Sequence, residues 1–183
     1  VTVTIPGNSA TSSGGYTYLS SSTGTVTGTV RDGAIGTVIS GASVSFNGSS
    51  TVTNSSGVYT LTVACVTGTL TVSKSGYVTA TPGYTVASCP GTNTKNVTLT
   101  PVPSITSISP SSGPTAGGNK VTIYGSHLQG ATSVTFGGSA GTVGYNPTTG
   151  ELESTVPGHA AGAVNVTVTI PGNSATSSGG YTY

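Results

Sequence analysis

Residues 166–183 read VTVTIPGNSATSSGGYTY, and residues 1–18 read the same eighteen letters at an offset of 165 residues. In each copy, Val, Val and Ile alternate with Thr before a Pro-Gly pair, which is the period-two pattern of a strand with one buried face. A Tyr-Thr-Tyr strand follows a Gly-Gly pair. We interpret the segment as the last two strands of a β-sandwich. Two strands alone are marginally stable in water, so residues 1–18 are expected to complete a domain that begins upstream or to dock on another molecule.

The composition predicts an all-β fold. Charged residues make up 4% of the chain, against about 25% in typical domains. Val, Thr, Ile and Tyr are abundant and suit a pleated, half-buried surface, while 29 Gly and 10 Pro supply turns. Disordered chains usually carry more charge and fewer β-branched residues. No stretch combines helical periodicity with good helix formers.

Charge and hydropathy argue against nucleic-acid binding and membrane insertion, and the cysteines indicate a cellular compartment. The net charge of +1 without a basic run argues against nucleic-acid binding, which needs clustered Lys and Arg. The apolar runs are only a few residues long, so no membrane insertion is expected. Cys65 and Cys89, in a Ser/Thr-rich chain of low charge, predict a disulfide and an oxidising compartment. Two buried free thiols are the alternative.

The segment 102–183 contains PSITSISPSSGPTAGGNKVTIYGSHL, SVTFGG, STVPGHAAGAVNVTVTI and GGYTY, in that order. It resembles an IPT/TIG domain, an immunoglobulin-like fold of cell-surface receptors, transcription factors and bacterial surface proteins. Gly117-Gly118 predicts a turn with positive φ or close backbone approach. The resemblance implies that residues 1–18 are the end of a preceding copy. The matching residues are Ile105, Pro110, Gly113, Gly117, Gly118, Val121, Ile123, Gly125, Leu128, Val134, Phe136, Gly137, Pro157, Gly162, Val166, Val168 and Tyr183.

The segment 19–101 contains GTVTGTVRDGAIGTVISGASVSFNGSSTVTNSSGVYTLTV, LTVSKSGYVTATPGY and KNVTLTP. It resembles the carboxypeptidase regulatory-like (transthyretin-like) β-sandwich and the Cna-B-type stalk modules. Asn47-Gly48 predicts a hairpin turn. Cys65 alternates in step with the inward-facing residues of its strand, so its side chain is expected on the core face. Cys89 is expected in the loop before the last strand. The residues that carry the resemblance are Gly28, Val30, Gly41, Ala42, Val44, Gly57, Tyr59, Leu61, Gly76, Tyr77, Val97 and Leu99.

Candidate catalytic groups are few, and we predict that the protein is not an enzyme. His127 and His159 are expected to be surface loop residues, and Glu151 and Glu153 are expected to be solvated, with no metal or cofactor bound. The Lys–Asn isopeptide bond of Cna-B modules is not expected either, because no Lys stands near Val26–Val30. Four of the nine Tyr belong to the repeat and Tyr59 and Tyr77 match core positions. The remaining Tyr84, Tyr124 and Tyr145 are the exposed candidates for binding surface glycans.

These observations predict tandem immunoglobulin-like β-sandwiches that form a structural repeat of an extracellular fibre, filament or adhesin stalk. Uncharged Ser and Thr faces and little net charge favour association with neighbouring copies. Tandem units in one chain are favoured over strand complementation between chains. The alternatives are accessory carbohydrate-binding modules of a secreted carbohydrate-active enzyme and, third, a receptor ectodomain. The predicted inter-unit residues are Val1, Val3, Ile5, Tyr16, Tyr18, Val166, Val168, Ile170, Tyr181 and Tyr183.

Overall fold

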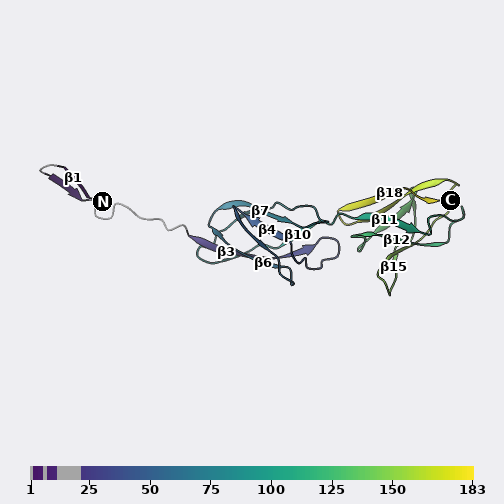
Figure 1. The fold of residues 1–183 in the computed structure, drawn as a ribbon, viewed down its shortest axis with the longest axis horizontal. Coiled ribbons are helices and arrows are strands. Elements are labelled where there is room, and N and C mark those ends of the chain that lie inside the picture. The colour runs from purple at the N-terminus through teal and green to yellow at the C-terminus, as the bar shows by residue number, and fades with distance from the viewer. Residues whose placement is uncertain (1, 6–7, 12–21) are drawn as a thin grey trace.

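Two β-sandwiches lie end to end along the long axis of the molecule (Figure 1). The computed structural model describes residues 2–5, 8–11 and 22–183, and every element in these ranges is a β-strand. The predicted all-β fold of tandem β-sandwiches is confirmed. Within this described part, no helix has the length and apolar character needed to cross a membrane.

The first sandwich packs two sheets around a core of alternating strand residues. Strand β3 (Thr23–Asp32) buries Val26 and Val30 and directs its Thr residues outward, as period-two alternation requires. Asn47 and Gly48, at φ 45° and 88°, form the predicted hairpin turn. One sheet contains β3 (Thr23–Asp32), antiparallel β6 (Val58–Ala64), and β9 (Thr92–Thr94) and β10 (Val97–Leu99), both parallel to β3. The other has the order β5 (Ser49–Val52), β4 (Ser43–Phe46), β7 (Thr67–Ser73), β8 (Gly83–Thr85).

The second sandwich is built in the same way. The predicted glycine turn is present, with φ 70° at Gly117 and 89° at Gly118. A Cβ on Gly117 would lie 2.5 Å from the carbonyl carbon of Pro157, so this position also requires glycine for close approach. One sheet has the order β11 (Ser104–Ser109), β12 (Lys120–Ser126), β16 (Leu152–Thr155), β15 (Gly144–Tyr145). The other has the order β14 (Ser139–Ala140), β13 (Ser133–Phe136), β17 (Ala163–Ile170), β18 (Asn173–Thr182).

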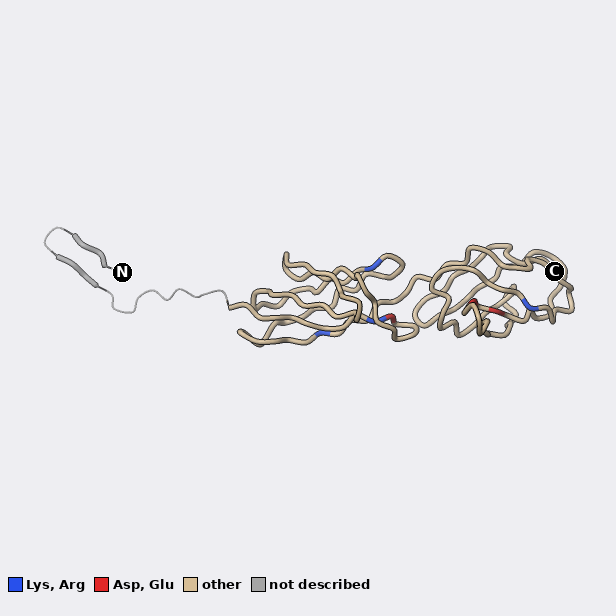
Figure 2. The backbone as a smooth tube through the Cα atoms, turned by 60° about the horizontal axis from the view of Figure 1, so that its bottom comes forward, with Lys and Arg blue, Asp and Glu red and all other residues tan. Residues whose placement is uncertain are grey.

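Threonines cover the outer face of the β9–β3–β6 sheet. Strand register aligns Thr25 with Thr62 and Thr92, and Thr27 with Thr60 and Thr94. Figure 2 shows how sparsely charged residues are scattered over both sandwiches. The outer faces of the strands are therefore mostly neutral hydroxyl surface.

The two copies of the repeated segment contain the same hairpin. β1 (Thr2–Ile5) pairs with β2 (Asn8–Thr11) from Thr2↔Thr11 to Ile5↔Asn8. In the other copy, β17 pairs with β18 from Thr167↔Thr176 to Ile170↔Asn173. Each pair in β1–β2 shifts by 165 residues onto a pair in β17–β18, so both copies have one register.

Candidate functional site: the repeated hairpin and the junction between sandwiches

The C-terminal copy of the hairpin closes the core of the second sandwich. Val166, Val168 and Ile170 are buried, and β17 pairs with β13 on the side opposite β18. The hairpin residues predicted to link units therefore first complete their own domain. A sandwich without this hairpin would lose one strand partner of β13 and a large part of its core.

Two tyrosines at the end of the repeated segment, Tyr181 and Tyr183, also pack in the second sandwich. Tyr181 is fully buried, packs edge-to-face on Phe136 at 5.5 Å and hydrogen-bonds through its hydroxyl to the side-chain amide of Asn119. The Tyr183 hydroxyl donates to the carbonyl of Pro157 at 2.8 Å. His159, predicted to be a surface loop residue, lies in a loop, is half-buried and stacks on the Tyr183 ring at 5.1 Å. This stacking could not be predicted, because Tyr183 is distant from His159 in sequence.

The N-terminal copy is described in its backbone alone. Val3 and Ile5 lie in β1, at the positions that correspond to buried Val168 and Ile170. The predicted inter-unit residues Val1, Tyr16 and Tyr18 lie outside the described residues.

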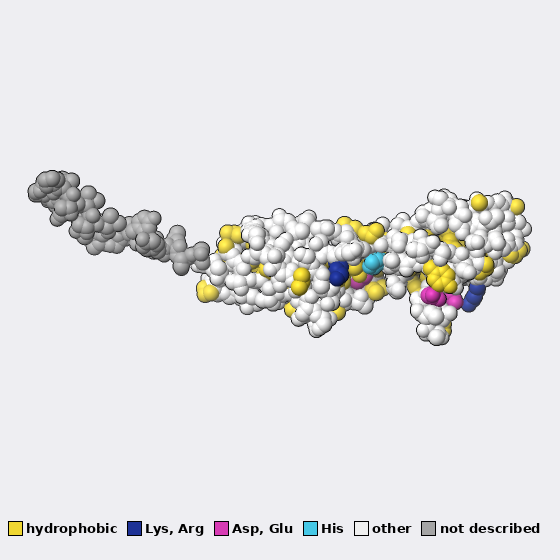
Figure 3. Space-filling view, viewed as in Figure 1, with side chains coloured by type: hydrophobic (Ala, Val, Ile, Leu, Met, Phe, Trp, Pro, Cys, Tyr) yellow, Lys and Arg dark blue, Asp and Glu magenta, His cyan; other side chains and the backbone are white. Residues whose placement is uncertain are grey.

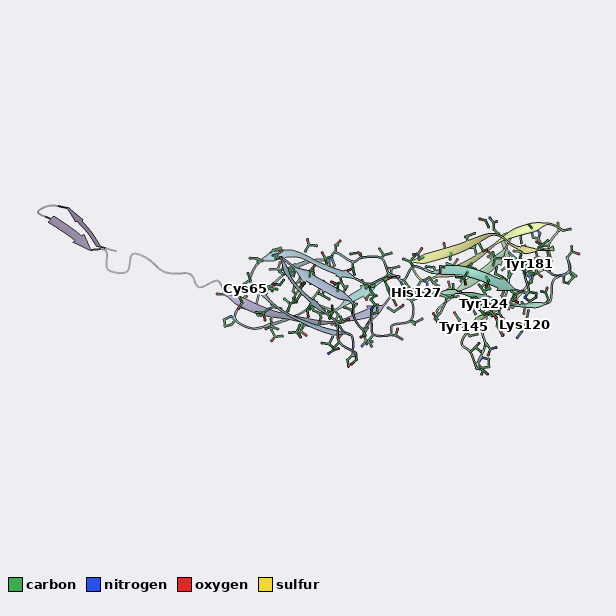
Figure 4. All side chains as sticks on the ribbon, in the orientation of Figure 1. Cys65, Lys120, Tyr124, His127, Tyr145 and Tyr181 are labelled. Carbon is green, nitrogen blue, oxygen red and sulfur yellow. A yellow bond between two sulfur atoms is a disulfide. The ribbon has the colours of Figure 1, made fainter. Side chains whose placement is uncertain are left out.

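Side chains from both sandwiches pack at the junction between them. The rings of Tyr77 and His127 meet edge-to-face at 4.8 Å, and the Tyr77 hydroxyl donates to buried Asp32 at 2.8 Å. Burial, together with the hydrogen bond to Asp32 and its charge, raises the pKa of Tyr77 to about 12. Asn173 adds a hydrogen bond from its amide to the carbonyl of Pro101 at 3.2 Å. Figure 4 labels His127 between the two sandwiches.

His127, predicted to be a surface loop residue, lies in the loop after β12 and is half-buried there. It has a φ of 53°, and its buried Nδ1 atom has no hydrogen-bond partner among the described residues. The contact that buries it comes from Tyr77 in the other sandwich, fifty residues earlier in the chain. Sequence reasoning within one module has no signal for such a contact.

Three glycines with positive φ make the junction close-fitting. A Cβ on Gly130 would lie 2.9 Å from Ile35, and one on Gly172 would lie 3.1 Å from Thr100. A Cβ on Gly76 would collide with the His127 ring. Each of these contacts crosses from one sandwich to the other. The two domains thus meet with little space for an added methyl group.

The structure joins Cys65 and Cys89 in a disulfide at the far end of the first sandwich, with a Cα–Cα distance of 6.2 Å. Both cysteines are half-buried against the core. The loop that carries Cys89 has a second anchor, which the sequence did not reveal. Buried Asn93 accepts hydrogen bonds from the backbone N–H groups of Ala87 and Ser88 and donates to the Ser88 carbonyl.

The acidic candidates lie together with Lys120 on the second sandwich. Lys120 forms a salt bridge of 3.5 Å with Glu153, which also accepts a hydrogen bond from Asn146. Glu151 accepts one from the Thr149 hydroxyl at 2.9 Å. Both residues, predicted to be solvated, are half-buried. In the described ranges, no group of three or more His, Cys, Asp or Glu side chains is placed to hold a metal ion.

The three tyrosines predicted to be exposed differ in environment. Tyr84 is half-buried, packs edge-to-face on Phe46 at 6.5 Å and hydrogen-bonds to the Thr94 carbonyl, so its predicted exposure was wrong. Tyr124 and Tyr145 are 37% and 40% exposed. They line one groove of about 170 Å³ on the second sandwich.

Comparisons with known proteins assign both sandwiches to domain families. Residues 25–100 match the carboxypeptidase regulatory-like domain and residues 103–183 match the IPT/TIG domain. No curated protein sequence shows significant similarity to the chain.

Several solved structures are similar to this chain at low identity. A cohesin–X-dockerin complex of Acetivibrio cellulolyticus is 23% identical over 42% of this chain and 56% of its own, with a TM-score of 0.36. SGBP-B from a xyloglucan utilization locus in Bacteroides uniformis is 18% identical over 76% of this chain and 41% of its own, with a TM-score of 0.38. The major pilin subunit of Bacillus cereus is 12% identical over 81% of this chain and 64% of its own, with a TM-score of 0.39. The chain thus spans about half the length of these structures, and at such TM-scores they support no functional argument.

Proposed function

Because the chain joins a carboxypeptidase regulatory-like domain to an IPT/TIG domain, we propose that it is a structural repeat unit of an extracellular fibre, filament or stalk. The observation that carries this proposal is the repeated hairpin. Eighteen identical residues recur at an offset of 165, and both copies pair in one register. Identical repetition is what tandem duplication of a structural unit leaves.

The place of β17–β18 in its sandwich suggests the role of β1–β2. In the second sandwich this hairpin pairs with β13 and fills the core. We therefore assign β1–β2 to the end of another IPT/TIG domain, whose remaining strands come from an earlier part of the same protein. The repeating unit is then one regulatory-like domain followed by one IPT/TIG domain. Strand complementation by a second copy is the less favoured arrangement.

The junction supports a stiff rod. Close contacts at Gly76, Gly130 and Gly172 and the Tyr77–His127 packing leave little freedom for bending between the domains. Units that contact only their neighbours build extended arrays, and head-to-tail contacts that do not close into a ring give filaments. Within one unit, the two domains should therefore keep a fixed spacing.

The surface and the disulfide support an extracellular location. A disulfide persists in oxidising compartments. Neutral Thr rows on the outer sheet face can pack against neighbours without burying unpaired charge. His127 and His159 are engaged in aromatic packing, and Glu151 and Glu153 in loop and salt-bridge contacts, which supports a structural role.

Electron microscopy of the native material tests the proposal. Two sandwiches end to end, with strands of roughly 8–10 residues at about 3.3 Å each, should give an axial period of roughly 60–80 Å. A recombinant chain with a second copy of residues 19–183 appended should lengthen by one such period. Dispersed native monomers, or an appended unit that folds back on the first, would contradict the proposal.

The second candidate is a pair of accessory carbohydrate-binding modules of a secreted carbohydrate-active enzyme. The groove lined by exposed Tyr124 and Tyr145 favours it. Mass spectrometry of the native polypeptide separates the two functions. Further 165-residue periods support the fibre, whereas a catalytic domain in the same polypeptide supports the enzyme accessory.

A further inference from the structure

A groove on the second sandwich is lined by both apolar and polar residues. Its lining includes Ile123, Leu128 and Leu152, which belong to the core, and Tyr124 and Tyr145, which are partly exposed. Figure 3 shows this region as a hydrophobic patch next to acidic side chains, where the turn after β15 projects from the sandwich. The volume of about 170 Å³ is below the roughly 300–1,000 Å³ of pockets for drug-sized ligands. The groove therefore fits one small ring of a longer ligand.

Hydrogen bonds fix the walls of the groove. The Tyr145 hydroxyl donates to the carbonyl of Leu128 at 3.1 Å and accepts from the N–H of Ala131 at 2.8 Å. These two bonds hold the ring in place while 40% of the side chain stays exposed. Figure 4 labels Tyr124 and Tyr145 near each other on this side of the sandwich. An aromatic ring held in this way binds with little loss of conformational freedom.

The loop that supplies the polar rim is also preorganised. The Asn146 side-chain oxygen accepts from the N–H groups of Thr148 and Thr149, and the backbone of Asn146 hydrogen-bonds to Glu151 and Gly150. Glu151, Thr149 and Gln129 line the rim. The rim thus places a carboxylate, a hydroxyl and an amide beside exposed aromatic faces.

Charge is concentrated here in a chain that otherwise has little. The whole sequence has seven charged side chains, and Lys120, Glu151 and Glu153 lie on this part of the second sandwich, with Glu153 neutralised by Lys120 at 3.5 Å. Glu151 has no salt bridge within the described residues. Its carboxylate disfavours an anionic ligand and accepts strong, charge-assisted hydrogen bonds from hydroxyl groups.

We propose that this groove binds one pyranose ring of a neutral polysaccharide. The apolar C–H face of the sugar packs on the partly exposed ring of Tyr124, and its hydroxyl groups bond to Glu151 and Gln129. The inference does not depend on the fibre. In a fibre, however, it would place one glycan contact on each 165-residue unit, and many weak contacts on one rod bind with high avidity.

Nuclear magnetic resonance titration of the chain tests the site without any polymer. The probes are cellohexaose, laminarihexaose, mannohexaose and xylohexaose, and amide shifts are followed in the ¹⁵N-labelled protein. At least one probe should shift the amides of the groove residues. Tyr124→Ala should weaken that binding by roughly tenfold, equivalent to about 1.4 kcal/mol. Glu151→Gln should weaken it by roughly fivefold, because a charged acceptor is replaced by a neutral one.

Thr122→Ala serves as the matched control. It alters the same strand as Tyr124, but Thr122 does not line the groove. It should bind as the unmodified chain does. The inference is overturned if no probe shifts the groove, if the shifts map elsewhere, or if Tyr124→Ala and Glu151→Gln leave the affinity unchanged. Should Tyr124→Ala unfold the domain, the comparison of Glu151→Gln with Thr122→Ala decides alone.

Discussion

At the scale of single residues, Tyr59 and Gly28 form a large–small pair in the first sandwich. They face each other across β3 and β6, and the buried Tyr59 hydroxyl donates to the Lys95 carbonyl at 2.6 Å. A Cβ on Gly28 would collide with that carbonyl and approach the Tyr59 ring. Glycine at this position therefore makes room for the ring and for its hydrogen bond.

Gly28→Ala should lower the free energy of unfolding by about 1–3 kcal/mol, because a packed core resists an added methyl group. Gly83→Ala is the matched control, since a Cβ at Gly83 would meet no atom within 4 Å and should change stability by less than about 0.5 kcal/mol. Urea unfolding followed by circular dichroism measures both. Equal effects in the two variants would contradict this account of Gly28.

Buried tyrosines predict a loss of stability at high pH. Burial, with a smaller contribution from Tyr84, raises the pKa of Tyr59 from 10.0 to about 12. The pKa of Tyr77 is also raised to about 12. The unfolded chain therefore loses these protons at lower pH than the folded chain. Their contribution to stability is full below pH 10 and is lost as pH rises toward 12. Thermal unfolding across this range should show the decline, and Tyr59→Phe should make it shallower.

Some single-residue features could be predicted from the sequence, and others could not. The Asn47-Gly48 turn and the Gly117-Gly118 turn follow from local backbone preference. His127 and Asn93 could not be predicted in this way, because their burial depends on partners brought near only by the tertiary fold.

At the scale of elements, the connection from β8 to β9 has two anchors. The disulfide Cys65–Cys89 closes a loop with a sequence separation of 24, and Asn93 binds the same loop through its side-chain amide. One anchor is covalent and acts on the unfolded chain, whereas the other stabilises the folded loop.

Replacing both cysteines by Ala should lower the stability of the first sandwich by about 3 kcal/mol, the loop-closure entropy of such a link. The second sandwich contains neither cysteine, so hydrogen exchange of β12 and β17 should stay unchanged and serves as the internal control. Asn93→Ala in this background should destabilise the first sandwich further. If the cysteine variant unfolds with unchanged stability, the disulfide adds no constraint beyond that of Asn93.

The repeated hairpin predicts complementation in trans. A chain of residues 19–165 lacks β18 and most of β17, so its second sandwich should not fold alone. A synthetic peptide of residues 1–18 has the missing sequence and should restore that sandwich. Dispersed amide signals of the ¹⁵N-labelled 19–165 chain in nuclear magnetic resonance spectra would show this. A Val3→Asp peptide should fail because the equivalent Val168 is buried, whereas Ser9→Asp should succeed because the equivalent Ser174 is exposed. Rescue by both peptides, or by neither, would contradict the assigned faces.

At the scale of the whole molecule, the tight junction should set the shape in solution. Gly130→Val places a branched side chain against Ile35 across the junction, whereas Gly36→Val has a similar φ of 74° and open space around it. Small-angle scattering should show a bent or more flexible particle for Gly130→Val alone. Similar profiles for the two variants would mean that the junction contacts do not hold the domains in line.

The sequence predicted the two sandwiches but not their joint. Domain class followed from alternation, turn glycines and family motifs such as Gly117-Gly118. The junction depends on steric fit between Gly130 and Ile35 and between Gly76 and His127. Such pairs belong to different domains and leave no periodic pattern in either one.

The scarcity of charge has a consequence for the environments in which this protein can work. Dissolved salt alters proteins partly by screening charges, and a rod with seven charged side chains (Figure 2) offers it very little to screen. Its folding and its contacts with neighbours should therefore change little with ionic strength over the range in which screening is the main effect of salt. Fresh and moderately salty water should suit the molecule equally well.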